Sequence, residues 1–426
     1  GGASAVTIVT KPDAYTVGSS DLGKILLFTG SWNEYATLGS ASTLGSGFYV
    51  TITNQSGNTH IINRSGSDLI SPNGSSGDSS YKLASGASVT LISDGTSKWL
   101  IKSISPYLYA ECNNNSGNFN PEATGAGSVA LGRSASASGT VSFAAGANSS
   151  YGGSTATGAG SVALGGSYAS GVNSFAAAIA NNTSSYGATG TNSVAIGQNA
   201  KSTNTGFAIG YQTQSTAAGA SVLGYGSIAS GSGSLALGKY AKASGFGSIA
   251  LGNEPSGYYT EASGRDSVAI GNRALASTRG KMAYTAKVFS DNGDAQQGTF
   301  VLLSDTTDAT AEAMTTSKGT AGTDNQVILP NNSAYTFSGT IVAREKASEG
   351  TDVGAWEVKG IIRREANAGT TVLVNSVINE LNVPTGWAIA LTADTTNGCL
   401  KIAVTGVAST NIRWVATINT SEVTYA

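Results

Sequence analysis

The stretch GAGSVALG decides the fold of this chain, and it occurs twice, at Gly125–Gly132 and at Gly158–Gly165. Each copy contains the pattern G-x-G-x-x-A, which in dinucleotide-binding domains brings the backbone close to a pyrophosphate at the start of a helix. Such a site needs a strand before the pattern and a helix after it. Here the following residues continue as short strands, so the pattern predicts glycine-mediated corners and not a phosphate site.

The same motif, written S-[VFLI]-A-[LIA]-G, recurs through the middle of the chain. Its spacing indicates a unit of about 14 residues with three insertions of about five residues. The clear copies are Ser128–Gly132, Ser142–Gly146, Ser161–Gly165, Ser193–Gly197, Ser234–Gly238, Ser248–Gly252 and Ser267–Gly271, and the degenerate ones are Ser174–Ala178, Gly206–Gly210 and Ser221–Gly224.

Apolar residues alternate within each unit, which places two aliphatic side chains on one face of a short strand. A second alternation follows in several units, as at Ala135 and Ala137. Two short strands with corners between them predict one coil of a parallel β-solenoid, stacked on its neighbours. We expect the aliphatic pairs to form the solenoid core: Val129, Leu131, Val162, Leu164, Val194, Ile196, Leu235, Leu237, Ile249, Leu251, Val268 and Ile270.

A coil of this size has almost no interior. Two aliphatic side chains per coil offset only part of the conformational entropy lost by about 14 ordered residues. Further apolar burial must therefore come from another chain, and we predict an obligate oligomer.

The run SVALG…ASASG…SFAAG resembles the head repeats of trimeric autotransporter adhesins, from Pro121 to about Gly280. The resemblance implies three left-handed parallel β-rolls packed around a threefold axis. A disordered Gly/Ser/Ala linker is the alternative, but it has no reason to keep an aliphatic pair at fixed spacing.

Residues 1–104 contain short alternating runs, including KILLF, GFYVTITN and KWLIK, separated by Gly, Ser, Asn and Asp. This pattern predicts a small antiparallel β domain. The segment resembles a module common in bacteriophage tail-fibre and virion proteins. Residues 105–120 are expected to form a linker into the shaft at 121–280.

Residues 281–426 contain longer strands with polar turns, which predict an antiparallel β-sandwich or jelly roll. The combination of GDAQ, AWEVKGIIRR, LTADTTNG and IRWVAT resembles the C-terminal domain of many phage tail-fibre proteins. Trp356, Trp387 and Trp414 fall on expected strands and are predicted to be core residues. The whole chain is thus expected to be all-β.

Composition excludes several classes of function. Charged residues make up 11% of the chain and the formal net charge is −2. The chain therefore lacks the positive electrostatic potential that attracts nucleic acid. No apolar run approaches the roughly 20 residues that span a bilayer, so no membrane insertion is expected. The cysteines, Cys112 and Cys399, make no disulfide framework, and the sequence leaves their state open.

The sequence contains few candidate residues for catalysis or metal binding. The only histidine, His60, lies in an alternating strand and favours a packed residue over a catalytic or metal-binding one. The shaft carboxylates favour turns and salt bridges over a sugar-cleaving pair. DNGD at Asp291–Asp294 favours a turn over a calcium loop, because the later ligands are missing. We expect no enzyme activity, metal or cofactor; the shaft carboxylates are Glu122, Glu254, Glu261 and Asp266.

The five-residue insertions carry tyrosines where a coil must bulge outward. Amphipathic rings suit both sugar faces and protein patches, although each ring also serves to cover the small core beneath its own bulge. Together with a tryptophan in a loop-like segment, they are the candidate receptor-binding residues: Tyr151, Tyr186, Tyr258, Tyr259 and Trp32.

These observations favour a homotrimeric phage tail fibre that attaches the virion to a host cell-surface glycan or protein. Its N-terminal end is expected to join other tail or baseplate proteins. One alternative is a purely structural virion fibre. Another is a fragment of a bacterial trimeric autotransporter adhesin on the cell surface, although residues 281–426 contain neither the heptads nor the barrel anchor of that family.

Overall fold

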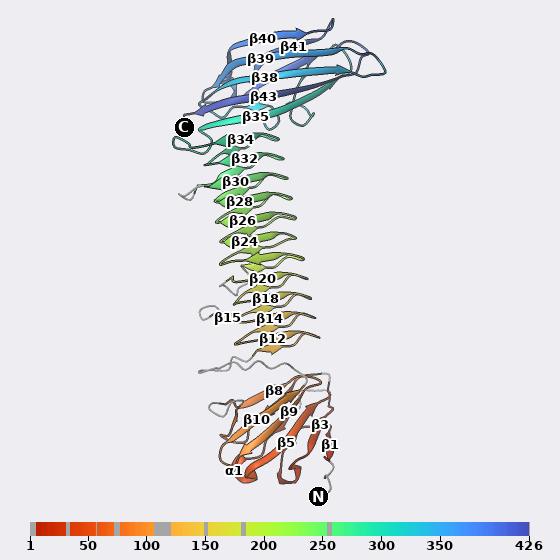
Figure 1. Cartoon of the computed structure of the whole chain (residues 1–426), viewed down its shortest axis with the longest axis vertical. Coiled ribbons are helices and arrows are strands. Elements are labelled where there is room, and N and C mark those ends of the chain that lie inside the picture. Colours follow the sequence, from red (N-terminus) through yellow and green to blue (C-terminus); the bar gives the residue numbers. More distant parts are fainter. Residues whose placement is uncertain are drawn as a thin grey trace. The chain divides into compact units, whose positions relative to one another are not determined.

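The computed structural model describes residues 6–30, 35–56, 58–71, 77–105, 121–148, 152–179, 185–253 and 258–425. The chain forms two compact units, residues 1–156 and 157–426, which are described separately (Figure 1). Trp32, Tyr151, Cys112 and Glu254 lie outside the described residues, as does almost all of the expected linker.

The N-terminal domain consists of two sheets between which the chain crosses back and forth. One sheet has the order β1 (Ile8–Lys11), β3 (Ile25–Phe28), β5 (Ser46–Asn54), β9 (Ser88–Asp94), β10 (Lys98–Ser105) and β7 (Leu69–Ser71); the other has the order β2 (Tyr15–Thr16), β4 (Tyr35–Thr37), β6 (His60–Asn63) and β8 (Ser80–Leu83), and a short helix, α1 (Ala41–Leu44), precedes β5.

The antiparallel prediction for this domain is wrong in part. β1, β3 and β5 pair in parallel, as do β2, β4 and β6, whereas β5, β9 and β10 are antiparallel. Alternation of apolar residues shows which face of a strand is buried but not the direction of its neighbour. The core between the sheets includes Leu26, Phe28 and Trp99.

The first unit also contains the first coils of the shaft. β12 (Val129–Leu131) pairs in parallel with β14 (Phe143–Ala145), and β11 (Glu122–Ala123), β13 (Ser136–Ala137) and β17 (Thr155–Ala156) form a second parallel ladder. The first insertion is bounded by a short antiparallel pair, β15 (Ala147–Asn148) and β16 (Gly152–Gly153).

The second unit contains two parallel ladders of the same kind. We call them shaft sheet 1 and shaft sheet 2. Shaft sheet 1 consists of β18 (Val162–Leu164), β20 (Phe175–Ala177), β22 (Val194–Ile196), β24 (Phe207–Tyr211), β26 (Ser221–Tyr225), β28 (Leu235–Lys239), β30 (Ile249–Asn253), β32 (Val268–Gly271) and β34 (Met282–Thr285). Shaft sheet 2 consists of β19 (Tyr168–Ala169), β21 (Gly187–Ala188), β23 (Lys201–Ser202), β25 (Gln214–Ser215), β27 (Ile228–Ala229), β29 (Ala241–Ala243), β31 (Thr260–Ala262) and β33 (Leu275–Ala276). The solenoid prediction is confirmed.

The predicted content of the coil interior is wrong. The central alanine of most motifs, such as Ala163, Ala236 or Ala250, is fully buried inside the coil. The two flanking aliphatic residues point outward and are only partly buried, because the narrow space between the two thin sheets favours small side chains. Val222, at the same position in another coil, is the larger exception. This correction applies to all twelve predicted core residues: Val129, Leu131, Val162, Leu164, Val194, Ile196, Leu235, Leu237, Ile249, Leu251, Val268 and Ile270.

The remaining motif positions shape the corners. Ser248 Oγ donates a hydrogen bond to the carbonyl oxygen of Gly245 (2.8 Å), and Ser267 and Gly264 repeat this contact. A Cβ atom on Gly245 would collide with the carbonyl oxygen of Gly264 in the next coil. Glycine is therefore required there by the close approach of adjacent coils.

Shaft sheet 1 extends one strand beyond the last motif copy. β34 pairs in parallel with β32, and then antiparallel with the first long strand of the C-terminal domain. The repeat pattern missed this strand because Lys281 and Thr285 stand where other copies have Ser and Gly.

The C-terminal domain is an antiparallel β-sandwich, which confirms that prediction. Sandwich sheet 1 has the order β35 (Ala295–Thr306), β43 (Ile412–Thr424), β38 (Ser333–Glu345), β39 (Val353–Arg364) and β40 (Val372–Asn382). Sandwich sheet 2 contains β36 (Glu312–Ala313), β42 (Cys399–Thr405), β37 (Val327–Ile328) and β41 (Ala388–Asp394).

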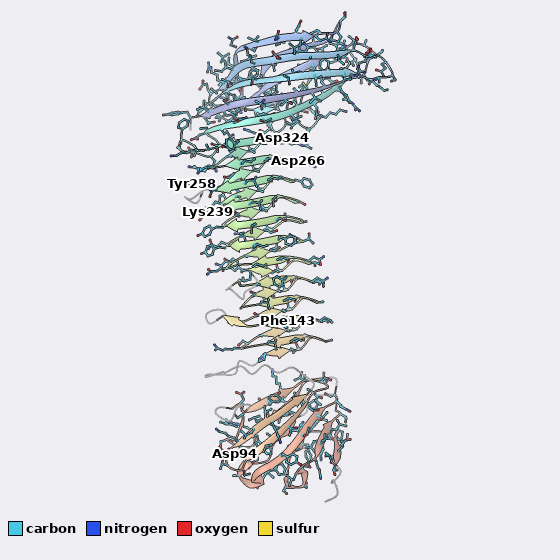
Figure 2. All side chains as sticks on the ribbon, in the orientation of Figure 1. Asp94, Phe143, Lys239, Tyr258, Asp266 and Asp324 are labelled. Atoms are coloured by element: carbon cyan, nitrogen blue, oxygen red, sulfur yellow. The ribbon has the colours of Figure 1, made fainter. Side chains whose placement is uncertain are left out.

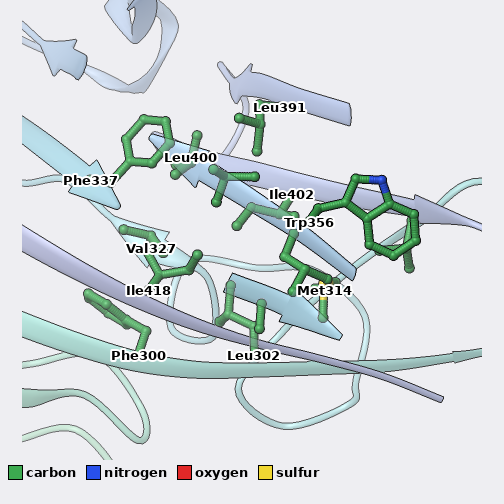
Figure 3. Close-up of a cluster of buried hydrophobic side chains, with 14 of the residues drawn as sticks. Phe300, Leu302, Met314, Val327, Phe337, Trp356, Leu391, Leu400, Ile402 and Ile418 are labelled. Atoms are coloured by element: carbon green, nitrogen blue, oxygen red, sulfur yellow. The ribbon is translucent and has the colours of Figure 1, made fainter. Parts of the chain in front are cut away.

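Side chains from both sandwich sheets meet in one core. Phe300 and Leu302 of β35 face Leu400 and Ile402 of β42 (Figure 3). The three tryptophans are buried, as predicted, and the ring centroids of Trp356 and Trp387 each lie 5.5 Å from that of Trp414. Among the described helices, none has the length and apolar character needed to cross a membrane.

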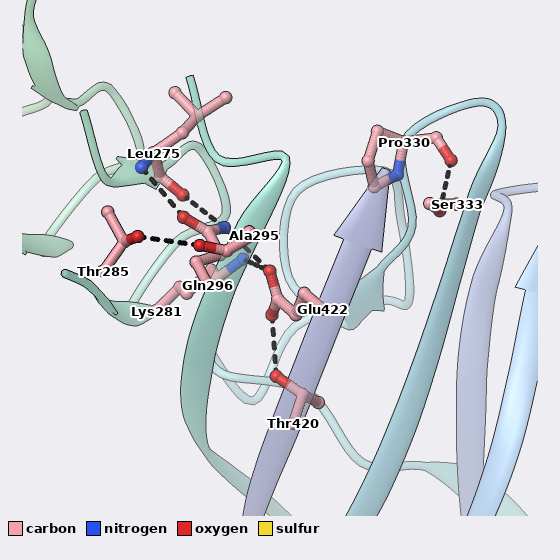
Figure 4. Close-up of polar contacts among 9 residues, drawn as sticks. All are labelled: Leu275, Lys281, Thr285, Ala295, Gln296, Pro330, Ser333, Thr420 and Glu422. Carbon is pink, nitrogen blue, oxygen red and sulfur yellow. Dashed lines mark hydrogen bonds and ion pairs between the residues drawn. The ribbon is translucent and has the colours of Figure 1, made fainter. Parts of the chain in front are cut away.

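A buried polar cluster joins the last shaft coil to the sandwich (Figure 4). The amide of Gln296 exchanges two hydrogen bonds with the backbone of Leu275, both 3.0 Å. Gln296 Nε2 also donates to Glu422 Oε2 (2.7 Å), and Thr285 Oγ1 donates to the carbonyl oxygen of Ala295 (2.7 Å). These contacts fix the sandwich to the end of the shaft.

Candidate functional site

The residues considered as catalytic candidates lie in packed or ion-paired positions or on the surface. His60 is buried in the N-terminal core, where its ring centroid lies 5.6 Å from that of Phe28. Glu261 Oε1 forms an ion pair with Lys242 Nζ (2.9 Å), and Asp266 Oδ2 forms one with Arg265 Nε (3.4 Å). Glu122 is exposed. Within the described ranges, no group of three or more His, Cys, Asp or Glu residues is arranged to hold a metal ion.

Asp294 organises a turn. Its carboxylate accepts backbone hydrogen bonds from Phe289 (2.9 Å), Ser290 (2.6 Å) and Asp291 (2.8 Å). Burial acts to raise the pKa of this carboxyl, but the hydrogen bonds outweigh it and hold the pKa below its usual value. The carboxylate oxygens therefore stabilise the turn through these hydrogen bonds.

Two of the predicted tyrosines lie beside this turn. Tyr258 is 54% exposed, and the guanidinium carbon of Arg273 lies 4.0 Å from its ring centroid. Asn292 links the elements: its Nδ2 donates to the carbonyl oxygen of Tyr259 (2.9 Å), and its Oδ1 accepts from Arg273 Nε (2.8 Å). Asn292 thus fixes Tyr259 and Arg273 beside the turn. Tyr186, in the second insertion, is half-buried.

Tyr259 belongs to a column of tyrosines along one edge of the shaft, and sequence reasoning missed the other members. Tyr211 and Tyr225 stack with centroids 4.8 Å apart, Tyr225 meets Tyr240 edge to face at 5.6 Å, and Tyr240 meets Tyr259 at 5.8 Å. We call Tyr211, Tyr225, Tyr240 and Tyr259 the tyrosine column. The missed signal is a Tyr that follows the motif glycine in IGY, LGY and LGKY.

Cationic groups accompany the tyrosine column. Lys239 Nζ lies 5.5 Å from the ring centroid of Tyr225 and 5.7 Å from that of Tyr240. Lys242 Nζ lies 6.0 Å from the ring of Tyr259. Lys239 and Tyr258 project from the same side of the shaft (Figure 2).

The tyrosine column presents amphipathic rings on the outside of the shaft. Its rings are partly exposed, and each combines an apolar face with a hydroxyl group. Repetition in successive coils presents similar groups at intervals of about 4.8 Å, which suits an extended polymeric ligand. Lys239 adds a positive charge at the centre of the column.

The C-terminal domain carries a groove. The groove, of about 630 Å³, crosses the outer face of sandwich sheet 1. Its lining combines polar side chains, including Thr336, Ser338 and Lys359, with the apolar residues Ile361 and Val377.

The solenoid and its outward-facing side chains define a repetitive fibre segment. Residues 123–149, 152–167, 188–206, 229–254 and 257–280 match the YadA head domain repeat. The shaft is therefore built from repeats of the type found in trimeric autotransporter adhesins, and such repeats indicate an adhesin-type surface fibre. No curated protein matches the chain.

Proposed function

We propose that the protein is a homotrimeric, non-enzymatic adhesive fibre of a phage tail, which attaches the virion to a glycan or protein on the host cell surface. The adhesin-type repeats support the adhesive fibre. The resemblance of residues 1–104 and 281–426 to phage tail-fibre modules supports the virion context. The N-terminal end would join other tail or baseplate proteins.

The observation that carries this proposal is a long apolar face on shaft sheet 1. Its strands pair in register, so that Phe207, Leu235, Ile249, Val268 and Met282 belong to one outward-facing column that Ser221 interrupts once. A second column runs from Ile209 through Leu223, Leu237, Leu251 and Ile270 to Tyr284 in the same strand pairs.

This apolar face is too exposed for an isolated shaft. In a single chain Phe207 is 51% exposed, Leu223 53% and Met282 46%. Continuous apolar patches of this kind indicate a protein interface. Three copies around an axis parallel to the shaft would bury the face in a closed, cyclic arrangement.

Light scattering tests the oligomer. The purified protein should have about three times the 42.5 kDa chain mass. Leu223→Asp should lower that mass, because it places three charges in the proposed interface. Gln214→Asp, on the outward face of shaft sheet 2, is the matched control and should stay trimeric. A wild-type monomer would refute the proposal.

Attachment would use the tyrosine column. Three copies on one rigid shaft would convert weak sugar binding into avid attachment to a repetitive surface. The test is adsorption competition: candidate host cells are incubated with the full-length protein and then challenged with phage that carry it. Blocked adsorption supports receptor binding, whereas a trimer that leaves adsorption unchanged supports a purely structural virion fibre.

A bacterial surface adhesin is the second candidate, because the YadA head repeats are as consistent with it as with a phage fibre. Mass spectrometry separates the two. Peptides of this chain in purified phage particles support the tail fibre, and peptides found only in the bacterial surface fraction support the adhesin.

A further inference from the structure

The apolar face of shaft sheet 1 continues onto the C-terminal sandwich. In the β34–β35 pair, Met282 lies opposite Thr299 and Tyr284 lies opposite Gln297. Paired residues project to the same side of a sheet, so Thr299 and Gln297 share the face of Met282 and Tyr284. Thr299 Oγ1 donates to Asn419 Oδ1 (2.9 Å), which shows that β43 carries this face further.

Register extends the face across all of sandwich sheet 1. β43, β38, β39 and β40 follow β35 in order, stacked beyond the end of the shaft (Figure 1). Four rows of side chains cross these strands on the outer side: Gln297, Ser421, Thr336, Ile361 and Asn375; Thr299, Asn419, Ser338, Lys359 and Val377; Val301, Thr417, Thr340, Glu357 and Asn379; and Leu303, Val415, Val342, Ala355 and Asn382.

The composition of these rows is unusual for a solvent-facing sheet. Val301, Val342 and Val415 are exposed, while the opposite side of the same strands is packed in the domain core. In these four central rows only Lys359 and Glu357 carry a charge. The flanking rows of the same face carry the other charges: Arg363 at one end, and Asp305, Arg344 and Arg413 at the other. Solvated sheet faces are normally polar and often charged, whereas interfaces are depleted of charge toward their centre.

We propose that the outer face of sandwich sheet 1 is a self-association surface, packed in the trimer against the same domain of the other two copies. This inference rests on the proposed trimer. When the shaft faces of three copies meet, the continuous sheet holds the sandwich faces opposite one another across the same axis. The groove of about 630 Å³ then lies inside the trimer and is filled by protein side chains.

The inference changes where a host receptor could bind. In the trimer, the outer face of sandwich sheet 1 is inaccessible to a cell-surface polymer. The outer side of sandwich sheet 2, including Ala390 and Thr392 of β41, remains open to solvent. Self-association therefore assigns the groove to assembly and leaves other surfaces to recognition.

Single cysteines and a short bis-maleimide test this surface in the full-length chain. Cys112 is replaced by serine in the background. Burial raises the pKa of the Cys399 thiol to about 12, which keeps it protonated and unreactive. Ser338→Cys probes sandwich sheet 1, Ser221→Cys probes the apolar face of the shaft, and Thr392→Cys probes the outer side of sandwich sheet 2. Light scattering checks the mass of every variant.

Ser338→Cys should give cross-linked chains on a denaturing gel as readily as Ser221→Cys, and Thr392→Cys should give none. A trimer that cross-links at position 221 but not at 338 overturns the inference while leaving the proposed trimer intact, and it opens the groove to a glycan or another partner. Equal cross-linking at 338 and 392 also overturns it, because that result indicates random collisions. A monomer without cross-links refutes the proposed trimer itself.

Discussion

Lys281 Nζ lies 2.6 Å from Glu422 Oε2, and the two side chains are 4% and 0% exposed. Glu422 also accepts hydrogen bonds from Gln296 Nε2 and Thr420 Oγ1, both 2.7 Å. Lys281 precedes the last shaft strand, and Glu422 belongs to the last strand of the chain. The ion pair therefore links the beginning and the end of the C-terminal domain at the point where the domain joins the shaft.

Removing one partner of this pair should be costly. Lys281→Met leaves the buried Glu422 carboxylate without its cationic partner and should lower the free energy of unfolding by about 3–5 kcal/mol. Urea unfolding followed by tryptophan fluorescence measures the loss. Lys281→Met combined with Glu422→Gln should recover a large part of it, and a double variant as unstable as the single one would contradict this account.

The glycine corner gives a second prediction. Gly245→Ala should destabilise the shaft by at least about 1–3 kcal/mol, because its Cβ would overlap the carbonyl oxygen of Gly264. Thermal unfolding followed by circular dichroism reports the change. Ser244→Ala, one residue earlier, is the control and should unfold at the wild-type temperature; equal melting of all three proteins would argue against close coil stacking.

One corner carries a removable strain. Val141 has φ +56° where Asn173 and Asn192 occupy equivalent corners at φ +54°. The left-handed conformation costs an L-residue about 1–2 kcal/mol, and asparagine tolerates it better than valine. Val141→Asn should therefore raise stability by roughly 1 kcal/mol. The side chain is exposed, so little packing is lost; a lower melting temperature would disprove the strain.

Asp294 makes stability depend on acid pH. Its pKa is lower in the folded protein than in the unfolded chain, so it contributes stability above the unfolded pKa, and that contribution is lost as pH falls through the folded pKa. Asp294→Asn should be less stable at pH 7 and should lose less stability on acidification. Urea midpoints from pH 7 to pH 3 test this, with Asp291→Asn as the neighbouring control. Parallel pH profiles for wild type and Asp294→Asn would exclude the effect.

The tyrosine column should carry host attachment. Combined Tyr225→Ala and Tyr240→Ala substitutions should weaken binding to host cells by roughly tenfold or more, since three copies of the site are lost at once. Tyr225→Phe and Tyr240→Phe keep the ring faces and separate stacking from hydroxyl contacts. Tyr168→Ala, on shaft sheet 2, is the control. Unchanged cell binding of a folded, trimeric alanine variant would remove the column from recognition.

Periodicity predicted the shaft but misplaced its interior. The alternation in SVALG correctly separates Val162 and Leu164 from Ala163, yet it does not say which side faces inward. Size settles this, because the narrow space between the two thin sheets favours a small side chain such as that of Ala163. The larger residues are therefore available for contacts between chains, and an inference from hydrophobicity alone reverses the two faces.

The candidate sites were predictable to different degrees. Tyr258 and Tyr259 stood out because insertions interrupt the repeat, whereas Tyr211, Tyr225 and Tyr240 sit within regular coils and require the coils to be stacked before they meet. The contact of Asn292 with Tyr259 joins segments 33 residues apart and has no local signal in the sequence. The groove needs the complete register of sandwich sheet 1.

The glycine corners have a consequence for the evolution of length. Each coil contacts only the coils before and after it, in the same register and at a rise of about 4.8 Å. Adding or deleting one 14-residue unit therefore changes the reach of the fibre by one fixed step and leaves the orientation of every outward face unchanged. Duplication or deletion of repeat units in the gene would therefore change the length of the shaft in equal steps. The domains at either end would need no redesign.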